Sequence, residues 1–251
     1  MHSNMTYLDG VNSILSGTGL SKRFGALTVL DNVDFHVPQN AAIGIVGPNG
    51  AGKTTLLNIL AGSMSASSGN VLVRGSDVTH LNSAARCKLG VARSHQVPRP
   101  FSGMTVFENV YVAAAYGHNG DRSDIYKRCI EALHICGMLG IANRRAETLG
   151  LLHRKRLELA RALATNPDVL LLDEIAGGLT DSEATELLAT IRALHARGLA
   201  IVWIEHIVHI LVQAIDHLIC LDGGRIIASG APRDVMANDA VIRAYLGGGV
   251  K

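Results

Sequence analysis

Short apolar runs that end in polar residues alternate along this 251-residue chain with longer stretches of helical periodicity. The runs at residues 42–46, 169–172 and 199–204 are almost continuously apolar, and the last two lead directly into the polar pairs 173–174 and 205–206. Parallel strands that are buried on both faces have this pattern, and open α/β sheets bind ligands beyond the carboxyl ends of such strands. The pattern therefore predicts a mostly parallel sheet with polar groups gathered at one edge.

A second pattern predicts antiparallel strands at the edge of the fold. Alternating runs between residues 14 and 37 are broken by three glycines and closed by Pro38. Shorter strands are expected at residues 70–74 and 89–92. From His217 onward, the pattern predicts a strand, a turn at the Gly-Gly pair 223–224, another strand and two short helices.

Helical periodicity occupies the middle of the chain, after a connector with two prolines at residues 97–101. Ile125, Cys129 and Leu133 recur at four-residue spacing, and a further helix is expected over 152–164. Another helix begins with the capping box Thr-Asp-Ser-Glu at 180–183. We therefore predict an α/β fold of the P-loop NTPase type: one domain over residues 1–251, with a mostly parallel sheet flanked by helices, an antiparallel β edge, and a helical sub-domain at about 97–165.

Composition narrows the class of protein only slightly. The net charge of +2 gives no basic field that would favour nucleic acid as a partner. The four cysteines form no C-x-x-C pair, so we expect reduced thiols rather than disulfides. The chain begins without a leader pattern and no stretch approaches 18 apolar residues, which predicts a cytoplasmic protein.

The stretch 42–57, AIGIVGPNGAGKTTLL, carries the most specific chemistry in the sequence. Gly47, Gly52, Lys53 and Thr54 satisfy the pattern G-x-x-x-x-G-K-[ST], in which backbone N–H groups and a helix N-terminus cradle phosphates. Lys53 can neutralise the outer phosphates and the Thr54 hydroxyl can bind Mg²⁺. An ordinary strand-to-helix turn is the alternative, but chance predicts only on the order of 0.01 such matches for this composition.

The polar pairs after the two later runs supply candidate catalytic groups. Beside a phosphate loop, Asp173 can hold Mg²⁺ and Glu174 can orient the attacking water. The alternative is that both are solvated acids at a strand end with no catalytic role. His206 can hydrogen-bond the outer phosphate, although a lone histidine is more often structural. His206 and His209 also have a spacing compatible with a metal, but two histidines are an incomplete ligand set. Phe24 can stack on a nucleotide base or simply belong to the core.

The order of the phosphate loop, Gln96, Asp173-Glu174 and His206 resembles the ATP-binding subunit of an ABC transporter over nearly the whole chain. The segments MTVFENV at 104–110, RLELAR at 156–161, IEH at 204–206 and IRAYLG at 242–247 resemble the branched-chain amino-acid uptake branch, which includes urea and amide importers. By matching position, the resemblance makes Phe24 the base-stacking aromatic, Gln96 the sensor of γ-phosphate and Mg²⁺, and His206 the switch residue.

The expected site residues follow from the loop and the resemblance together. The nucleotide ligands are Phe24, Gly47, Pro48, Asn49, Gly50, Ala51, Gly52, Lys53, Thr54 and Thr55; the Mg²⁺ ligands are Thr54, Gln96 and Asp173; the catalytic residues are Glu174, His206 and Gln96. The cofactors are ATP and Mg²⁺. The resemblance implies a second cassette, identical or different, two membrane permease subunits and, indirectly, a substrate-binding protein, with the chain held on the inner face of the cell membrane.

One motif departs from the family pattern. The signature loop, close to L-S-G-G-Q in the family, is here the signature-like loop of residues 149–153, Leu-Gly-Leu-Leu-His. Gly150 lacks the serine hydroxyl, and Leu152 places a side chain where a glycine backbone approaches the partner's γ-phosphate. A smaller departure is Ile175, which stands where the family usually has proline.

Three functions are possible for a cassette of this kind. The leading one is Mg²⁺-ATP hydrolysis by the motor of an importer, and the second is a cassette whose degenerate signature makes one composite site a regulatory clamp with little hydrolysis. A non-transport cassette acting on ribosomes or DNA would carry two tandem phosphate loops or a coiled-coil insertion, and the sequence has neither. The arginines and lysine clustered between residues 144 and 161 are better explained as a solvated helix face than as a nucleic-acid site.

Overall fold

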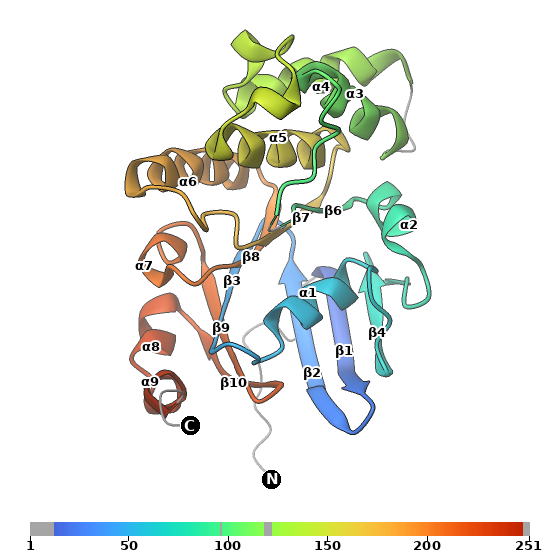
Figure 1. Ribbon diagram of the computed structural model, residues 1–251. Coiled ribbons are helices and arrows are strands. Elements are labelled where there is room, and N and C mark those ends of the chain that lie inside the picture. The colour runs from blue at the N-terminus through green and yellow to red at the C-terminus, as the bar shows by residue number, and fades with distance from the viewer. Residues whose placement is uncertain (1–12, 96, 118–121, 248–251) are drawn as a thin grey trace.

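The computed structural model describes residues 13–95, 97–117 and 122–247, and it contains two sheets (Figure 1). The smaller sheet is four-stranded and antiparallel, with the order β2-β1-β4-β5. Its strands are β1 (Ser13–Phe24), β2 (Leu27–Pro38), β4 (Ser68–Val73) and β5 (Ser76–Asp77). This sheet confirms the antiparallel strands predicted for residues 14–37 and the strand predicted near residues 70–74.

The larger sheet is six-stranded, with the order β10-β9-β3-β8-β7-β6. Its strands are β3 (Ala42–Val46), β6 (Val91–Arg93), β7 (Val169–Asp173), β8 (Ala200–Ile204), β9 (His217–Asp222) and β10 (Arg225–Gly230). All neighbours are parallel except β9 and β10, so the three apolar runs of the sequence are adjacent inner strands. The carboxyl ends of β3, β7 and β8 therefore meet at one edge.

One strand begins later than the sequence pattern predicts. The expected strand 89–92 is β6, Val91–Arg93, because Leu89 caps the short helix α2 (Ser83–Lys88), which the periodicity did not predict. Asn82 begins that helix by accepting a hydrogen bond from the Ala85 amide, and Gly90 turns the chain with a φ of 95°. An N-cap of this kind can nucleate a single turn that is too short to show a period.

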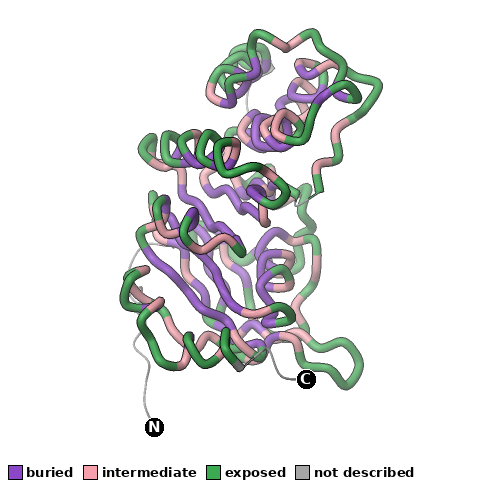
Figure 2. The backbone as a smooth tube through the Cα atoms, turned by 60° about the vertical axis from the view of Figure 1, so that its left-hand side comes forward, coloured by how far each residue is buried: buried purple, intermediate pink, exposed green. Residues whose placement is uncertain are grey.

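Two hydrophobic cores lie on opposite faces of the larger sheet because successive strand side chains point to opposite faces. Ile43 and Ile45 of β3 pack with α1 (Lys53–Leu60) and the smaller sheet, whereas Ala42 and Val46 face the other helices. Helix α1 is thus packed between the two sheets, and Gly62, with a φ of 74°, follows its end as predicted. Figure 2 shows the buried strands running through the molecule and the helices buried along one side.

Helices α3, α4 and α5 gather at the end of the molecule opposite the β1–β2 hairpin (Figure 1). The helices of the central and C-terminal parts are α3 (Val106–Tyr116), α4 (Ile125–Ile135), α5 (Leu151–Ala164), α6 (Asp181–Ala196), α7 (Val208–Leu211), α8 (Pro232–Met236) and α9 (Asp239–Gly247), with 3₁₀ turns at Arg122–Asp124, Leu139–Ile141 and Ala146–Thr148. Ile125, Cys129 and Leu133 are buried on α4, as their spacing predicts. The predicted capping box is present at the start of α6, and α3 has another. The C-terminal order of strand, Gly-Gly turn, strand and two helices is also confirmed.

Candidate nucleotide site

The phosphate loop, residues 47–54, connects the end of β3 to the first turn of α1. Gly47 has a φ of 145°, and a Cβ there would lie 2.0 Å from the carbonyl oxygen of Leu221. Gly52 caps α1 with a φ of 102°, and a Cβ there would lie 2.8 Å from the carbonyl oxygen of Val29. Both positions therefore require glycine, and a glycine-rich loop at a helix N-terminus lets an anion approach the backbone closely.

Lys53 folds back over this loop. Its Nζ donates to the carbonyl oxygens of Gly47 at 2.7 Å and Pro48 at 3.0 Å, and the residue is only 6% exposed. Burial lowers the pKa of Lys53, while the nearby charges of Glu174 and Asp173 oppose that shift. A buried ammonium held by two carbonyl groups is well placed to meet a phosphate, because a charged partner relieves the cost of its desolvation.

A cavity of about 190 Å³ opens above the loop and brings together residues that are far apart in the sequence. Its lining residues are Val29, Asn49, Gly50, Ala51, Gly52, Lys53, Thr54, Thr55, Glu174 and His206. Nine of these ten residues are predicted nucleotide ligands or catalytic residues, and Val29 is the tenth. Gly47 and Pro48 are not part of the lining, but their carbonyl oxygens bind Lys53. The cavity therefore joins the phosphate cradle to the polar ends of β7 and β8.

Glu174 and His206 meet at this edge because their strands are neighbours in register. Asp173 pairs with Ile204 across β7 and β8, and His206 Nε2 lies 2.7 Å from Glu174 Oε1. The Glu174 side chain is 16% exposed and that of His206 is 48% exposed. A carboxylate and an imidazole in contact beside a phosphate cradle can orient a water molecule and hydrogen-bond a phosphate oxygen.

Asp173 lies deeper than its neighbour, at 2% exposure. Its Oδ2 accepts a hydrogen bond from Arg93 Nη2 at 2.8 Å, while its Oδ1 is buried without a partner among the described residues. The charge of Asp173 also acts on Lys53 of the phosphate loop. An unsatisfied carboxylate oxygen is a ligand that Mg²⁺ binds, usually together with phosphate oxygens and water. Within the described ranges no three or more His, Cys, Asp or Glu side chains cluster, so neither this site nor the His206–His209 pair is a complete protein-only metal site.

The predicted base-stacking aromatic residue stands apart from this cavity. Phe24 ends β1, is 47% exposed and has Lys22 Nζ 5.1 Å from its ring centroid, but it is not among the residues that line the cavity. Val29 of β2 lines the cavity instead, and nothing in the local sequence marked it. Gln96 lies outside the described residues.

Comparison with known proteins shows which family this chain belongs to. The family model for ABC transporters matches residues 30–177, a span that contains the phosphate loop and the Asp173-Glu174 pair. The chain belongs to the ABC transporter family. A second model, for branched-chain amino acid ATP-binding cassette transporters, matches residues 225–251.

Individual relatives are similar over almost the whole cassette. This chain is 34% identical to the high-affinity branched-chain amino acid transport ATP-binding protein LivG of Escherichia coli, and the similarity covers 93% of this chain and 98% of LivG. The corresponding protein BraF of Pseudomonas aeruginosa is 32% identical over 93% of this chain and 98% of its own length. The ADP conformation of MJ1267, an ATP-binding cassette of an ABC transporter, has a TM-score of 0.85 and 29% identity, covering 94% and 99% of the two chains. The protein is thus an ATP-binding subunit of this family and an ATPase by homology.

The signature-like loop of the cassette precedes helix α5. Gly150 is the N-cap residue of α5 and provides no side-chain cap. Its φ is −68°, and a Cβ at this position would meet no atom within 4 Å, so the backbone does not require glycine here. Leu151 is 44% exposed, and its Cδ2 would lie 3.2 Å from a Cβ at Gly178. The first turn of α5 therefore packs beside the segment that follows Glu174.

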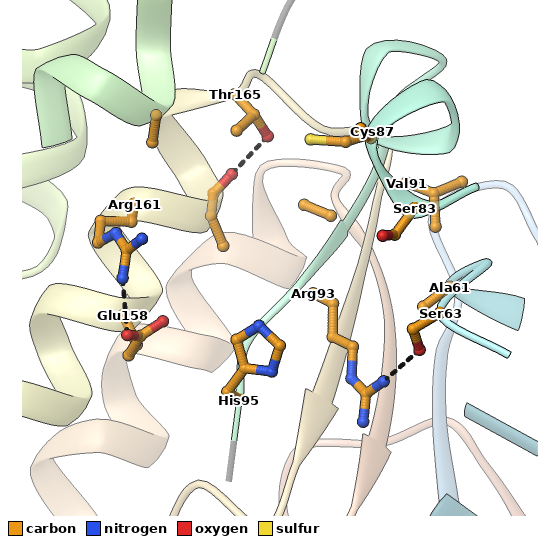
Figure 3. A pocket seen from close by; sticks show the side chains of 14 residues that line it. Ala61, Ser63, Ser83, Cys87, Val91, Arg93, His95, Glu158, Arg161 and Thr165 are labelled. Carbon is orange, nitrogen blue, oxygen red and sulfur yellow. Dashed lines mark hydrogen bonds and ion pairs between the residues drawn. The ribbon is translucent and has the colours of Figure 1, made fainter. Parts of the chain in front are cut away.

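A second cavity, of about 310 Å³, lies between α2, β6 and α5 of the cassette. Figure 3 shows Arg93, His95, Glu158 and Arg161 around it, with Arg161 bound to Glu158 at 2.8 Å. Burial lowers the pKa of His95, and Glu158 opposes that shift. Arg93 lines this cavity and also binds Asp173, so it connects the second cavity to the nucleotide site.

Two residues that the sequence did not single out also hold the cassette's site in place. The amide of Gly47 donates to the hydroxyl of Tyr245 on α9 at 2.9 Å, which ties the C-terminal helix to the phosphate loop. Arg93 is the other, and its Nη1 also contacts Asn58 and Ser63. Among the described residues, none of the cassette's helices is long and apolar enough to cross a membrane.

Proposed function

We propose that this cassette is the ATP-hydrolysing motor of an importer for branched-chain amino acids or related small solutes. The solute class rests on the relatives LivG and BraF and on the matching C-terminal model. The single observation that carries the chemistry is the Glu174–His206 contact of 2.7 Å at the wall of the cavity that the phosphate loop lines. No observation favours the alternative in which the cassette is only a regulatory clamp.

The phosphates of ATP lie along the backbone N–H groups of the phosphate loop, with the Lys53 ammonium beside the outer phosphates. Glu174 orients a water molecule toward the γ-phosphorus and accepts its proton. His206 donates a hydrogen bond to a γ-phosphate oxygen, and its contact with Glu174 keeps both groups on the same side of the phosphate. Phe24 is assigned to the base of the nucleotide as an exposed aromatic residue at the end of β1.

Thr54, Asp173 and Gln96 are the residues that would hold Mg²⁺. The unpartnered Oδ1 of Asp173 supports this assignment, as does the hydroxyl of Thr54 in the cavity lining. When bound, the ion neutralises charge on the β- and γ-phosphates.

The proposed assembly has two cassettes, identical or different, that sandwich two ATP molecules, two membrane permease subunits and a substrate-binding protein that delivers the solute. The chain forms one domain, with a helical sub-domain at about 97–165 that includes α3, α4 and α5. It works in the cytoplasm, on the inner face of the membrane, through the permease and without nucleic acid. The cavity in Figure 3 supports a permease contact in a groove beside residues 97–107, because Glu158 and Arg161 of its lining bind the backbone of Arg99.

The decisive experiment measures ATP hydrolysis and solute uptake by the complex that co-purifies with this chain from native membranes, reconstituted in vesicles. Glu174→Gln should retain ATP binding but abolish both activities, whereas Glu131→Gln, a matched change at an exposed carboxylate on α4, should leave them unchanged. Hydrolysis at the wild-type rate by Glu174→Gln would refute the proposed role. Engineered cysteines at Ser102 or Thr105 should cross-link to a permease loop, and cross-links formed only elsewhere would contradict the proposed groove.

A further inference from the structure

Two buried charged side chains near the nucleotide site have no role in the chemistry described above. Lys155 on α5 is 6% exposed, and Glu205, which follows β8, is 2% exposed. Removing each ion from water costs several kcal/mol unless partners replace the lost hydration. Their contacts therefore indicate what these two charges hold in place.

Both side chains bind the backbone around Glu174. Lys155 Nζ donates to the carbonyl oxygen of Glu174 at 3.2 Å. Glu205 Oε1 accepts from the amide of Ala176 at 2.7 Å and from the indole of Trp203 at 3.3 Å. The peptide groups on either side of Ile175 are thus held from two elements, α5 and the end of β8.

The backbone that they hold is strained. Glu174 has a φ of 48°, in the left-handed region that residues other than glycine rarely adopt. Such a conformation costs on the order of 1–3 kcal/mol and persists only where the surroundings determine it. The Glu174 amide also donates to the carbonyl oxygen of Ile204 at 2.9 Å, and in this arrangement its carboxylate reaches His206.

The charges of Lys155 and Glu205 stabilise each other. Burial lowers the pKa of Lys155, and the negative charges of Glu205 and Glu174 oppose that shift. Burial raises the pKa of Glu205, which the hydrogen bonds from Ala176 and Trp203 and the charge of Lys155 oppose. Each charge thus favours the ionised form of the other across the segment that contains Glu174.

We propose that Lys155 and Glu205 are positioning residues that hold the left-handed backbone of Glu174, so that its carboxylate stays aligned for hydrolysis. The proposal rests on the proposed function of Glu174. Lys155 lies one turn into the helix that begins at the signature-like loop, and Leu151 of that turn packs beside Gly178. The position of α5 is therefore linked to the backbone of the catalytic carboxylate within the same chain.

The test compares Lys155→Met, Lys155→Arg and the matched surface change Lys127→Met in the assembled transporter. Lys155→Met should lower kcat by on the order of 10- to 100-fold, while KM for ATP and the Kd for a fluorescent ATP analogue stay unchanged. Lys155→Arg keeps a donor and a charge and should restore most of the turnover. Lys127, exposed on α4, should have no effect when replaced.

A second pair of variants tests the acceptor side. Glu205→Gln keeps an oxygen for the Ala176 amide and should retain most of the turnover, whereas Glu205→Leu leaves that buried amide unpaired and should lose it. If Lys155→Met does not fold, as thermal unfolding will show, Lys155→Gln replaces it in the same comparison.

Unchanged kcat in both Lys155→Met and Glu205→Leu would overturn the proposal. Equal losses in kcat, nucleotide affinity and thermal stability would also overturn it, because they would show a general structural role. A separate result, wild-type turnover by Glu174→Gln, would refute the proposed function itself, so the two failures are distinguishable.

Discussion

The phosphate loop and the signature-like loop both lead into helices, α1 and α5, but the chain constrains them very differently. In the phosphate loop, a Cβ at Gly47 or Gly52 would collide with backbone, and Lys53 binds two carbonyl oxygens of its own loop. At Gly150 a Cβ would meet nothing within 4 Å, and no side chain caps the helix. The packing of this chain fixes the first loop, whereas position 150 of the second loop can accept another residue without disturbing the fold.

This difference indicates where the requirement on each loop comes from. The phosphate loop must fit its own strand and helix, so its residues are constrained even before ATP binds. In the proposed dimer, the signature-like loop would instead face the nucleotide of another chain. A cassette can therefore keep a complete phosphate loop of its own while its signature-like loop contacts the partner's nucleotide poorly. Four experiments can break or sharpen this comparison.

The largest effect is expected from replacing the glutamates of the two cassettes one at a time. If the partner is a different cassette with an intact signature, this chain's Glu174 belongs to the active composite site. Glu174→Gln should then lower turnover of the complex by roughly 10²- to 10⁴-fold, because an amide orients and deprotonates water poorly. The equivalent change in the partner should cost little. Steady-state ATPase measurements on the two reconstituted variants decide the matter, and equal losses would refute the asymmetric model.

The next effect concerns binding rather than turnover. Lys53→Ala removes the buried cation nearest the phosphates, and a charge-assisted contact of this kind contributes about 1.5–3 kcal/mol, or roughly 10- to 150-fold in Kd. Calorimetric titration with ATP measures the loss. Lys127→Ala is the matched control, since Lys127 is exposed on α4. Unchanged affinity in Lys53→Ala would show that the backbone of the loop binds the phosphates without its lysine.

Those parts of the site that are contiguous in the sequence could be predicted from it. The phosphate loop combines strand, glycine turn and helix within residues 42–57, and the acids 173–174 directly end an apolar run. The meeting of Glu174 with His206 was also predictable, because parallel strands deliver their carboxyl ends to one edge. The role of Phe24 remains a prediction, since the cavity lining includes Val29 and not Phe24.

The supporting contacts could not be predicted because they join distant residues that have no local pattern. Arg93 binds Asp173 across 80 positions, Glu205 binds the Ala176 amide across 29, and Tyr245 binds the Gly47 amide across 198. Each of these side chains is unremarkable within its own segment. Only the strand order and the packing of α5 and α9 bring them to the site. No local pattern marks the left-handed φ of Glu174 either.

A smaller effect is expected from restoring the signature-like loop with Gly150→Ser and Leu152→Gly together. The serine fits, because its Cβ meets no atom within 4 Å, and it can cap α5. With a different and intact partner cassette, one site already works, so turnover should rise by about two-fold at most. In a homodimer both sites face the degenerate loop, and the rise should reach about ten-fold, the value of one recovered hydrogen bond to a charged phosphate. A fall in ATPase activity, with unchanged thermal unfolding, would mean that Leu152 supports the contact across the dimer.

The smallest effect is a pH dependence of stability that arises on β9, next to the strand β3 that leads into the phosphate loop. His217 begins β9, pairs with Ile43 of β3 and is 7% exposed, with its Nε2 2.7 Å from Ser229 Oγ. Burial lowers the pKa of His217, so the unfolded chain takes up a proton before the folded chain does. This residue's contribution to stability is therefore complete above the unfolded value of about 6.5 and declines as the pH falls below it, by about 1.4 kcal/mol for each unit by which the pKa is lowered.

Urea unfolding between about pH 8 and pH 5 should show a weaker acid dependence in His217→Gln than in the wild type. The exposed His134 of α4 provides the control, since His134→Gln should leave the slope unchanged. An identical slope in all three proteins would show that His217 is not a source of acid sensitivity.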